Sequence, residues 1–161
     1  MKPMPRLLLV SLLFLLVGCD HVTKHVAKSE LEQRDSVELV SGVLDLRYVE
    51  NHGSAFNLLR FIPPRARMAL LVIANTVVLL LMLALWRRYF RPTALNQLAL
   101  LLLLSGGLGN LADRVLRGYV VDFIHLHRWP VFNAADVFVA LGGALLLLQM
   151  IRKQDRLEQA S

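Results

Sequence analysis

Residues 68–86 read MALLVIANTVVLLLMLALW, a stretch in which only Asn75 and Thr76 are polar. A helix needs about 20 predominantly apolar residues to cross the roughly 30 Å hydrocarbon layer of a bilayer. No charge interrupts the stretch, and Arg87 and Arg88 follow it directly. It therefore predicts a transmembrane helix.

The composition of the whole chain supports a membrane protein. Hydrophobic residues make up 56% of the 161 residues and charged residues 19%, against about 25% charged in ordinary soluble domains. The length fits a single domain. The single cysteine, Cys19, excludes an internal disulfide framework and a zinc site of four cysteines.

Three further apolar stretches occupy residues 7–17, 95–111 and 137–151. We therefore predict a single polytopic domain, with four transmembrane helices that span about residues 5–22, 68–86, 94–112 and 135–151 and leave outer loops at 23–67 and 113–134. The first stretch is short and follows Lys2 and Arg6, so it also fits the core of a signal peptide.

Basic residues gather on one predicted side of the membrane. The N-terminus, residues 87–91 and the C-terminus carry eight of them against two acidic residues, which accounts for the whole net charge of +6. The positive-inside rule therefore places both termini in the cytoplasm, although Arg65 and Arg67 oppose this orientation. The basic character reflects membrane topology, which argues against a nucleic-acid partner.

The first outer loop contains a pattern typical of strands. Apolar residues alternate in part over residues 37–48 around Ser41-Gly42, which favours a short hairpin or small sheet outside the membrane. Pro63-Pro64 indicates a break before the second span. Most polar residues of interest lie in the two outer loops or at the outer helix ends, so we expect any chemistry at the outer membrane–water boundary.

Acidic residues at the edge of the hydrocarbon layer are costly, and they are usually paired or functional. Asp20 has Lys24 four residues later, which favours a structural ion pair across one helical turn. Asp113 is adjacent to Arg114 and follows Asn110 by one turn, so a structural cluster is again the simpler interpretation.

Asp122 and Asp136 have no neighbouring cation in the sequence. They cannot meet along one helix, but a loop that returns through Trp129-Pro130 could bring them face to face. Two adjacent carboxyl groups cannot both ionise cheaply, so one keeps a proton while the other acts as a base, as cleavage of an amide by water requires. The alternative for Asp136 is a structural one, as an N-cap or first-turn acid of the fourth span.

Other residues allow further interpretations. Ser54 and Lys24 could form a serine–lysine nucleophile pair, although Gly53 and Ala55 favour a tight turn at Ser54. His125 and His127 could offer two metal ligands, but no third ligand motif accompanies them, so we expect exposed loop histidines.

Small residues within the spans have a packing interpretation. Gly106, Gly107 and Gly109 follow no predicted strand, so they favour close helix packing and not a phosphate loop. Residues 16–19, LVGC, are similar to a lipobox, and a chain cut before Cys19 would keep three spans with an allowed topology. We expect Cys19 to be an ordinary residue of the first helix, where a thiol packs without difficulty.

Five short segments together resemble the bacterial lipoprotein signal peptidase family, also called signal peptidase II. They occur in the family's order and span nearly the whole chain: DHVTK at 20–24, ENHGSAF at 50–56, GNLADR at 109–114, VVDFI at 120–124 and FNAAD at 132–136.

The resemblance implies an aspartic peptidase of the bacterial cytoplasmic (inner) membrane, with four transmembrane helices, a small outer β-platform and a short interfacial helix. Its catalytic residues would be Asp122 and Asp136. Residues that match supporting or substrate-binding positions of the family are Asp20, Lys24, Asn51, Gly53, Asn110, Asp113, Arg114, Asn133 and Ala135. Neither a metal nor another cofactor is expected.

The resemblance also implies the partners. Substrates would be diacylglyceryl-modified prolipoproteins, cut before the lipid-bearing cysteine at the outer face of the membrane, and globomycin-type compounds would inhibit the cleavage. Membrane lipids would surround the helices. Two other classes stay open on the residues alone: a non-enzymatic polytopic membrane protein whose carboxylates pair structurally or relay protons, and a lipoprotein-like binding module anchored through Cys19.

Overall fold

The four apolar stretches form four long helices in the computed structural model, which describes residues 3–53, 61–89 and 93–158. Each helix has 24 to 26 residues, and at 1.5 Å per residue each exceeds the roughly 30 Å of hydrocarbon in a bilayer. All four are apolar enough to cross a membrane. Their bounds are α1 (Arg6–Leu31), α2 (Pro64–Tyr89), α3 (Ala94–Arg117) and α4 (Ala134–Glu158).

The helices continue past the predicted ends of the spans. Residues 23–31, 64–67 and 113–117 are helical, whereas the sequence placed them in the outer loops. Hydropathy marks the part of a helix that lies in hydrocarbon, and a helix can extend beyond that part when its polar turns find partners. Lys24 and Lys28 find such partners in this extension of α1.

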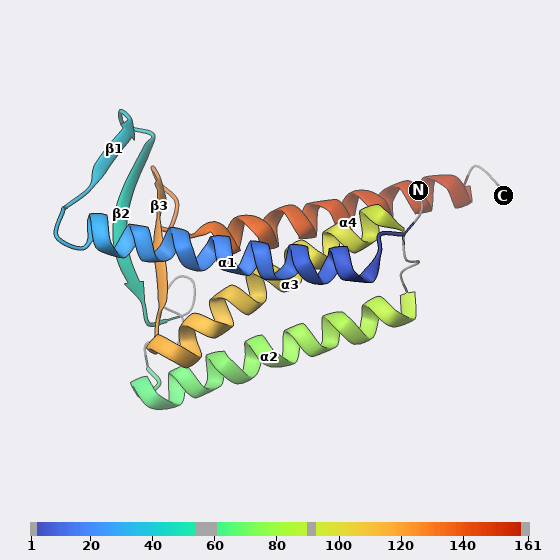
Figure 1. Cartoon of the computed structure of the whole chain (residues 1–161), viewed down its shortest axis with the longest axis horizontal. Coiled ribbons are helices and arrows are strands. Elements are labelled where there is room, and N and C mark those ends of the chain that lie inside the picture. The colour runs from blue at the N-terminus through green and yellow to red at the C-terminus, as the bar shows by residue number, and fades with distance from the viewer. Residues whose placement is uncertain (1–2, 54–60, 90–92, 159–161) are drawn as a thin grey trace.

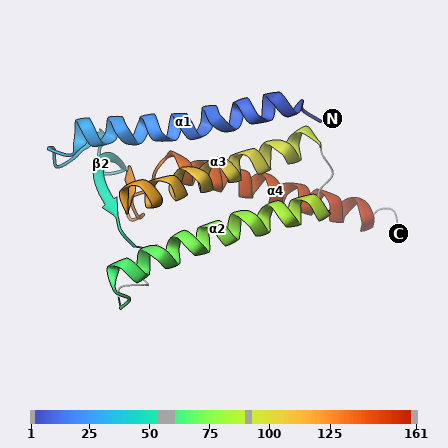
Figure 2. The ribbon, with the colours of Figure 1, turned by 60° about the horizontal axis from the view of Figure 1, so that its bottom comes forward.

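Helix α3 lies at the centre of the bundle and contacts α1, α2 and α4 (Figure 2). Three glycines allow these contacts, because a Cβ atom would collide with a different neighbour at each. At Gly106 it would meet the backbone of Ala135 at the start of α4, at Gly107 it would meet Leu79 of α2, and at Gly109 it would meet Asp20 of α1. This confirms the packing interpretation of the glycines.

A three-stranded antiparallel sheet covers one end of the bundle, opposite the end that holds both termini (Figure 1). Its strands are β1 (Val37–Val40), β2 (Leu44–Asn51) and β3 (Val120–Leu126), in the order β1-β2-β3. The β1–β2 hairpin confirms the predicted one, and Gly42 supplies the positive φ of +66° that its turn requires. Strand β3 was not predicted.

The connections around β3 bring distant residues to one place. Helix α3 ends at Gly118, whose φ of +80° reverses the chain directly into β3. After β3 the chain turns through Trp129, whose N–H donates to the Leu126 carbonyl, and returns beside Ile124 as far as Phe132. The return leads directly into α4, as the expected loop through Trp129-Pro130 requires.

The short interfacial helix that the resemblance implies does not occur among residues 3–53, 61–89 and 93–158. Ser54 and the rest of the segment 54–60 lie outside the described residues.

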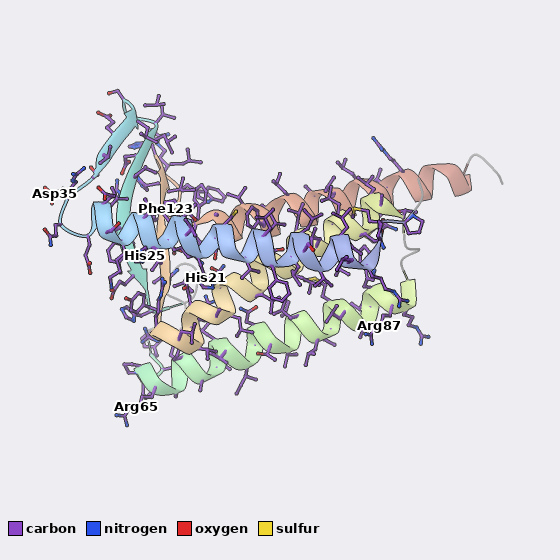
Figure 3. All side chains as sticks on the ribbon, in the orientation of Figure 1. His21, His25, Asp35, Arg65, Arg87 and Phe123 are labelled. Atoms are coloured by element: carbon purple, nitrogen blue, oxygen red, sulfur yellow. The ribbon has the colours of Figure 1, made fainter. Side chains whose placement is uncertain are left out.

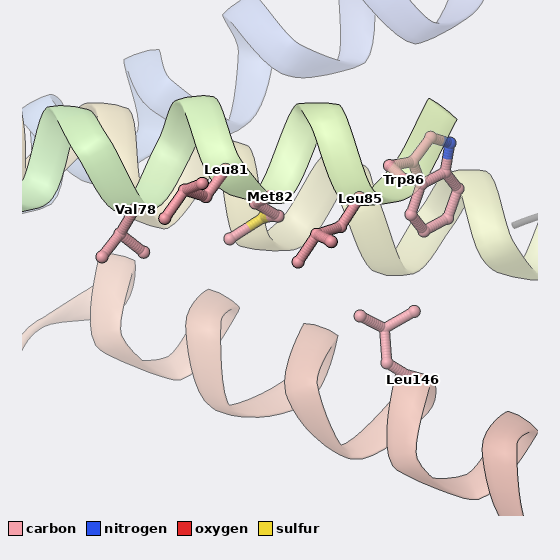
Figure 4. Close-up of a pocket in the computed structure, with 6 residues that line it drawn as sticks. All are labelled: Val78, Leu81, Met82, Leu85, Trp86 and Leu146. Atoms are coloured by element: carbon pink, nitrogen blue, oxygen red, sulfur yellow. The ribbon is translucent and has the colours of Figure 1, made fainter. Parts of the chain in front are cut away.

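A groove of about 290 Å³ separates part of α2 from α4 (Figure 4). Its walls are apolar, and they consist of Val78, Leu81, Met82, Leu85, Trp86 and Leu146. These residues lie in the halves of α2 and α4 away from the sheet. The groove therefore offers no group for chemistry, and the polar residues at the sheet end of the bundle form the candidate site.

Candidate active site

Asp122 and Asp136 come from different elements but share one neighbour, Asn133. Asp122 lies on β3 with only 3% of its surface exposed, and Asp136 lies in the first turn of α4. The Asn133 side-chain Nδ2 donates to Asp122 Oδ1 at 2.6 Å, and its backbone N–H donates to Asp136 Oδ2 at 3.2 Å. The structure thus brings together the two carboxyl groups that the sequence singled out.

Two more asparagines complete the hydrogen bonds to these carboxyl groups. Asn51 Nδ2 donates to Asp122 Oδ2 at 2.9 Å, and Asn110 Nδ2 donates to Asp136 Oδ1 at 2.8 Å. Within the described residues, each of the four carboxyl oxygens therefore accepts one N–H group. Such donors stabilise and orient a carboxylate, and they leave its remaining lone pairs available for water or substrate.

The three asparagine side chains are held with their oxygens away from the carboxyl groups. The backbone N–H of Gly53 donates to Asn51 Oδ1, the backbone N–H of Asp136 donates to Asn133 Oδ1, and Lys24 Nζ donates to Asn110 Oδ1. These three groups can only donate, so each fixes the amide with its NH₂ group toward an aspartate. Gly53 therefore contacts the candidate site through its backbone N–H.

The structural interpretation of Asp136 is also correct. Asn133 Oδ1 accepts from the backbone N–H of Asp136 at 3.1 Å, and Asp136 Oδ2 accepts from the backbone N–H of Asn133 at 3.2 Å. This reciprocal pair is a capping box at the start of α4. One oxygen of Asp136 serves the helix start, while the other faces Asn110.

Asp20 and Asp113 belong to a separate, fully buried ion cluster. Lys24 Nζ lies 2.8 Å from Asp20 Oδ2 and 2.9 Å from Asp113 Oδ2, and all three side chains are inaccessible to solvent. The expected Asp20–Lys24 pair is therefore present. Asp113 pairs with Lys24 and with Arg117 at 3.3 Å, whereas the sequence suggested a cluster with Arg114.

Arg117 was missed, although its position one turn after Asp113 on α3 was a readable signal. Arg114 instead donates to the Asn110 carbonyl at 3.3 Å, and its charge acts on both Asp136 and Asp122. Ala135 is fully buried, and its backbone N–H donates to Asp20 Oδ1 at 2.9 Å. No ion pair joins Asp122 or Asp136 to a lysine, arginine or histidine within the described residues.

Burial raises the pKa of Asp122 to about 6. The hydrogen bond from Asn51 opposes this shift, while the negative charge of Asp136 adds to it. Asp122 therefore holds a proton at a pH where an exposed aspartate is ionised. A protonated and an ionised carboxyl group on a shared asparagine can supply an acid and a base together.

The other candidate residues lie apart from this site. His125 Nδ1 lies 2.7 Å from Asp45 Oδ1, and it shares the sheet surface with Arg47. Arg47 and His125 lower the pKa of Asp45 to about 2, which marks a structural charge cluster. His127 is exposed, and no three His, Cys, Asp or Glu side chains in the described part of the chain are placed to share a metal ion.

A second polar cluster on the sheet was not anticipated. Lys28 Nζ donates to Tyr119 Oη at 3.2 Å, and Tyr48 Oη donates to Glu50 Oε1 at 2.9 Å. His52 contacts both Glu50 and the ring of Tyr119. These contacts join the C-terminal end of α1 to β2 and to the residue before β3, close to Asn51 in the sequence.

Comparisons with known proteins match most of the chain. Residues 12–152 match the family model described as signal peptidase (SPase) II. The lipoprotein signal peptidase of Moorella thermoacetica is 36% identical over 92% of this chain and 93% of its own length. That of Ectopseudomonas mendocina is 37% identical, over 96% of this chain and 92% of the relative.

Solved structures agree with this match. A bacterial membrane enzyme solved by the in meso method at 2.3 Å resolution superposes with a TM-score of 0.83 at 26% identity, over 96% of this chain and 94% of that structure. A second, at 1.9 Å resolution, gives a TM-score of 0.79 at 27% identity, over 92% of this chain and 96% of that structure. By its sequence, this chain belongs to the signal peptidase II family.

Proposed function

We propose that this chain is an aspartic endopeptidase that removes the signal peptide from diacylglyceryl-modified prolipoproteins, with Asp122 and Asp136 as its catalytic residues. The observation that carries the proposal is the pair of carboxyl groups joined through Asn133. The substrate class follows from the lipoprotein signal peptidases that the chain resembles over most of its length.

The ion pairs divide the acidic residues of the outer helix ends into two kinds. Asp20 and Asp113 are neutralised by Lys24 inside the protein, which is the expected arrangement for structural acids. Among the described residues, Asp122 and Asp136 instead accept hydrogen bonds from the amide N–H groups of Asn51, Asn110 and Asn133. Because no ion pair within the described residues neutralises these two carboxyl groups, we assign the acid–base catalysis to them.

The proposed reaction divides two tasks between the carboxyl groups. Asp122 holds the proton, because burial raises its pKa, and Asp136 acts as the base. Asp136 takes a proton from water as the water oxygen attacks the carbonyl carbon of the scissile amide, and Asp122 donates its proton to the carbonyl oxygen. The tetrahedral intermediate then collapses: Asp136 gives its proton to the amide nitrogen, the C–N bond breaks and the amine of the lipidated cysteine leaves. One hydroxyl group of the intermediate returns its proton to Asp122 as the new carboxyl group forms.

The position of the site suits this substrate. The site lies at the sheet end of the bundle, where α1 and α3 end and α4 begins (Figure 1). This is the predicted boundary between hydrocarbon and water. A diacylated cysteine keeps its acyl chains in the bilayer, so its neighbouring peptide bond lies at the same depth. We therefore place the cut immediately before the lipidated cysteine, and we expect membrane lipids and globomycin-type inhibitors to bind at the same boundary.

Charge supports an orientation with both termini in the cytoplasm and the site on the outer face. Arg87 lies at the end of α2 near the termini, and Arg65 lies at the opposite end, beside the sheet (Figure 3). The excess of basic residues lies at the end with Arg87, which the positive-inside rule assigns to the cytoplasm. Asp35→Cys and Arg87→Cys, each made in a chain with Cys19→Ala, test this orientation in intact cells. A membrane-impermeant thiol reagent should modify the cysteine at position 35 and not the one at position 87.

The decisive experiment uses the purified full-length protein in lipid nanodiscs with a diacylated prolipoprotein. Mass spectrometry should find a product that begins at the lipidated cysteine, and Asp136→Asn should prevent its formation. The absence of cleavage by the folded wild-type protein would favour the non-enzymatic interpretation. Retained cleavage in Asp136→Asn together with its loss in folded Ser54→Ala would favour the serine–lysine interpretation.

A further inference from the structure

Lys24 has three polar partners inside the protein, two through hydrogen bonds and one through an ion pair. Its Nζ atom lies 2.8 Å from Asp20 Oδ2, 2.9 Å from Asp113 Oδ2 and 3.0 Å from Asn110 Oδ1. An ammonium group has three donors, so three partners match its capacity. The side chain is also fully buried, which means that Lys24 cannot contact a substrate.

Charge balance accounts for only two of these contacts. Asp20 and Asp113 already provide two negative charges to Lys24, and Arg117 supplies a further positive charge beside Asp113 at 3.3 Å. The remaining contact is a hydrogen bond to a neutral amide, Asn110, which adds nothing to charge neutrality. It does determine what Asn110 can offer to its other neighbours.

The amide of Asn110 connects the ion cluster to the carboxyl pair. Its Oδ1 accepts from Lys24 and, at 3.1 Å, from Asn133 Nδ2, while its own Nδ2 donates to Asp136 Oδ1 at 2.8 Å. Because Lys24 can only donate, a reversed amide would set an NH₂ group against the ammonium. A charged donor on the amide oxygen also polarises the amide and strengthens its N–H donation to Asp136.

We propose that Lys24 is a positioning residue for the cleavage reaction. Lys24 holds the Asn110 amide in the orientation in which its Nδ2 donates to Asp136 Oδ1, and this hydrogen bond fixes the Asp136 carboxyl group. The inference rests on the proposed function of Asp136. A second contact acts in the same direction: Lys24 binds one oxygen of Asp20, and the other oxygen accepts the backbone N–H of Ala135, the residue before Asp136.

The first test compares two identical substitutions on α1. Lys24→Met should lower kcat by about ten- to hundredfold, the scale of a displaced catalytic group, with KM changed by less than about twofold. Lys28→Met is the matched control, because Lys28 lies one turn later and contacts Tyr119 and Glu32. It should keep kcat within about twofold of the wild-type value.

A double-mutant cycle separates positioning from a merely structural function. Asn110→Leu removes the amide that Lys24 is proposed to hold. The fold-loss of kcat caused by Lys24→Met should therefore be smaller in the Asn110→Leu background than in the wild type, by a factor of about five or more. Single-turnover measurements with excess protein keep slow variants measurable. A structural function alone predicts the same fold-loss in both backgrounds, and that outcome would overturn the proposal.

Removal of Lys24 leaves buried carboxylates without their cation, which can prevent folding. The pair Asp113→Asn and Asp113→Asn/Lys24→Met avoids this, because the double variant loses one charge of each sign. The double variant should show kcat about ten- to hundredfold below that of Asp113→Asn, with a comparable Tm. Equal kcat values in these two folded variants would refute the inference.

The proposed function can fail separately. If wild-type protein cleaves a prolipoprotein and Asp136→Asn does not, the function stands whatever Lys24→Met does. If Asp136→Asn cleaves normally, the proposed function fails before Lys24 is considered.

Discussion

The carboxylate of Asp20 accepts a hydrogen bond of 2.9 Å from the backbone N–H of Ala135, across 115 positions of the sequence. This bond joins α1 to the first turn of α4, next to Asp136. It requires close approach of α1 to α3, which the missing side chain of Gly109 allows. Asp20 therefore joins α1 to α4 beside Asp136, and its side chain is fully buried.

Asn substitutions of the two carboxyl groups should abolish cleavage. Asp122→Asn and Asp136→Asn remove the proposed proton donor and the proposed base, and each should lower kcat by about 10²- to 10⁴-fold. The double variant should be hardly slower than either single variant, because members of one catalytic unit fail together. Single-turnover cleavage of a diacylated prolipoprotein measures both effects, and near-normal turnover in either folded variant would contradict the assignment.

The pH dependence of cleavage should report Asp122. Burial raises its pKa to about 6, so the group is protonated below that pH and kcat/KM should decline as the pH rises through it. Asn51 lowers the pKa of Asp122 by donating to its ionised form. Asn51→Ala should therefore move the alkaline limb of the kcat/KM profile to higher pH; a limb that moves to lower pH would refute this explanation.

Gly109→Ala should destabilise the protein and slow cleavage. Its Cβ atom would lie 2.5 Å from Asp20 Oδ2, so Asp20 or α1 must move, at a cost of about 1–3 kcal/mol in the free energy of unfolding. Gly143→Ala on α4 is the control, because nothing lies within 4 Å of its Cβ position. Thermal unfolding in detergent should show a lower Tm for Gly109→Ala alone, and equal Tm values would exclude the steric explanation.

Cys19→Ala should leave cleavage and membrane insertion unchanged. Cys19 is exposed on the continuous helix α1, one residue before the buried Asp20, and it makes no contact that the site uses. The intact mass of protein purified from its native membrane checks the related prediction that the chain is not processed here. A chain that begins at a diacylated Cys19 would establish the lipobox interpretation instead.

Metal chelators should not affect cleavage. Asn51, Asn110 and Asn133 all direct NH₂ groups toward Asp122 and Asp136, and the positive ends of these groups occupy the positions where a cation would need oxygen or nitrogen lone pairs. Cleavage measured before and after dialysis against EDTA tests this. A loss of activity that added Zn²⁺ or Mg²⁺ restores would show that the amides reorient around a metal.

The elements that could be predicted from the sequence are those with local signals. Apolar runs marked all four helices, and partial alternation over residues 37–48 marked the β1–β2 hairpin. Strand β3 gave no such signal, because Val120, Val121 and Asp122 are all buried and their pattern does not alternate. Its strand structure depends on pairing with β2, about 75 positions earlier in the chain, and no local rule reveals such a partner.

The residues of the candidate site likewise differ in whether a local sequence signal reveals them. Spacing identified the Asp20–Lys24 pair, and the lack of a neighbouring cation singled out Asp122 and Asp136. Spacing grouped Asp113 with Arg114, whereas its ion-pair partners are Arg117 one turn later on α3 and Lys24 on α1, a contact that no local spacing reveals. The asparagines could be selected only by resemblance, since the orientation of an amide depends on donors from distant parts of the chain.

The capping box at the start of α4 links local order to reactivity. Helix ends are ordinarily where secondary structure frays first, with opening free energies near zero. Here the first turn is held by Asn133 and Asp136 themselves, and by the bond from Ala135 to Asp20. Fraying of that turn would release Asp136 from Asn133. The same opening would expose the backbone amide hydrogens of residues 135 and 136 to solvent. Their rate of hydrogen exchange should therefore also measure how often the site comes apart.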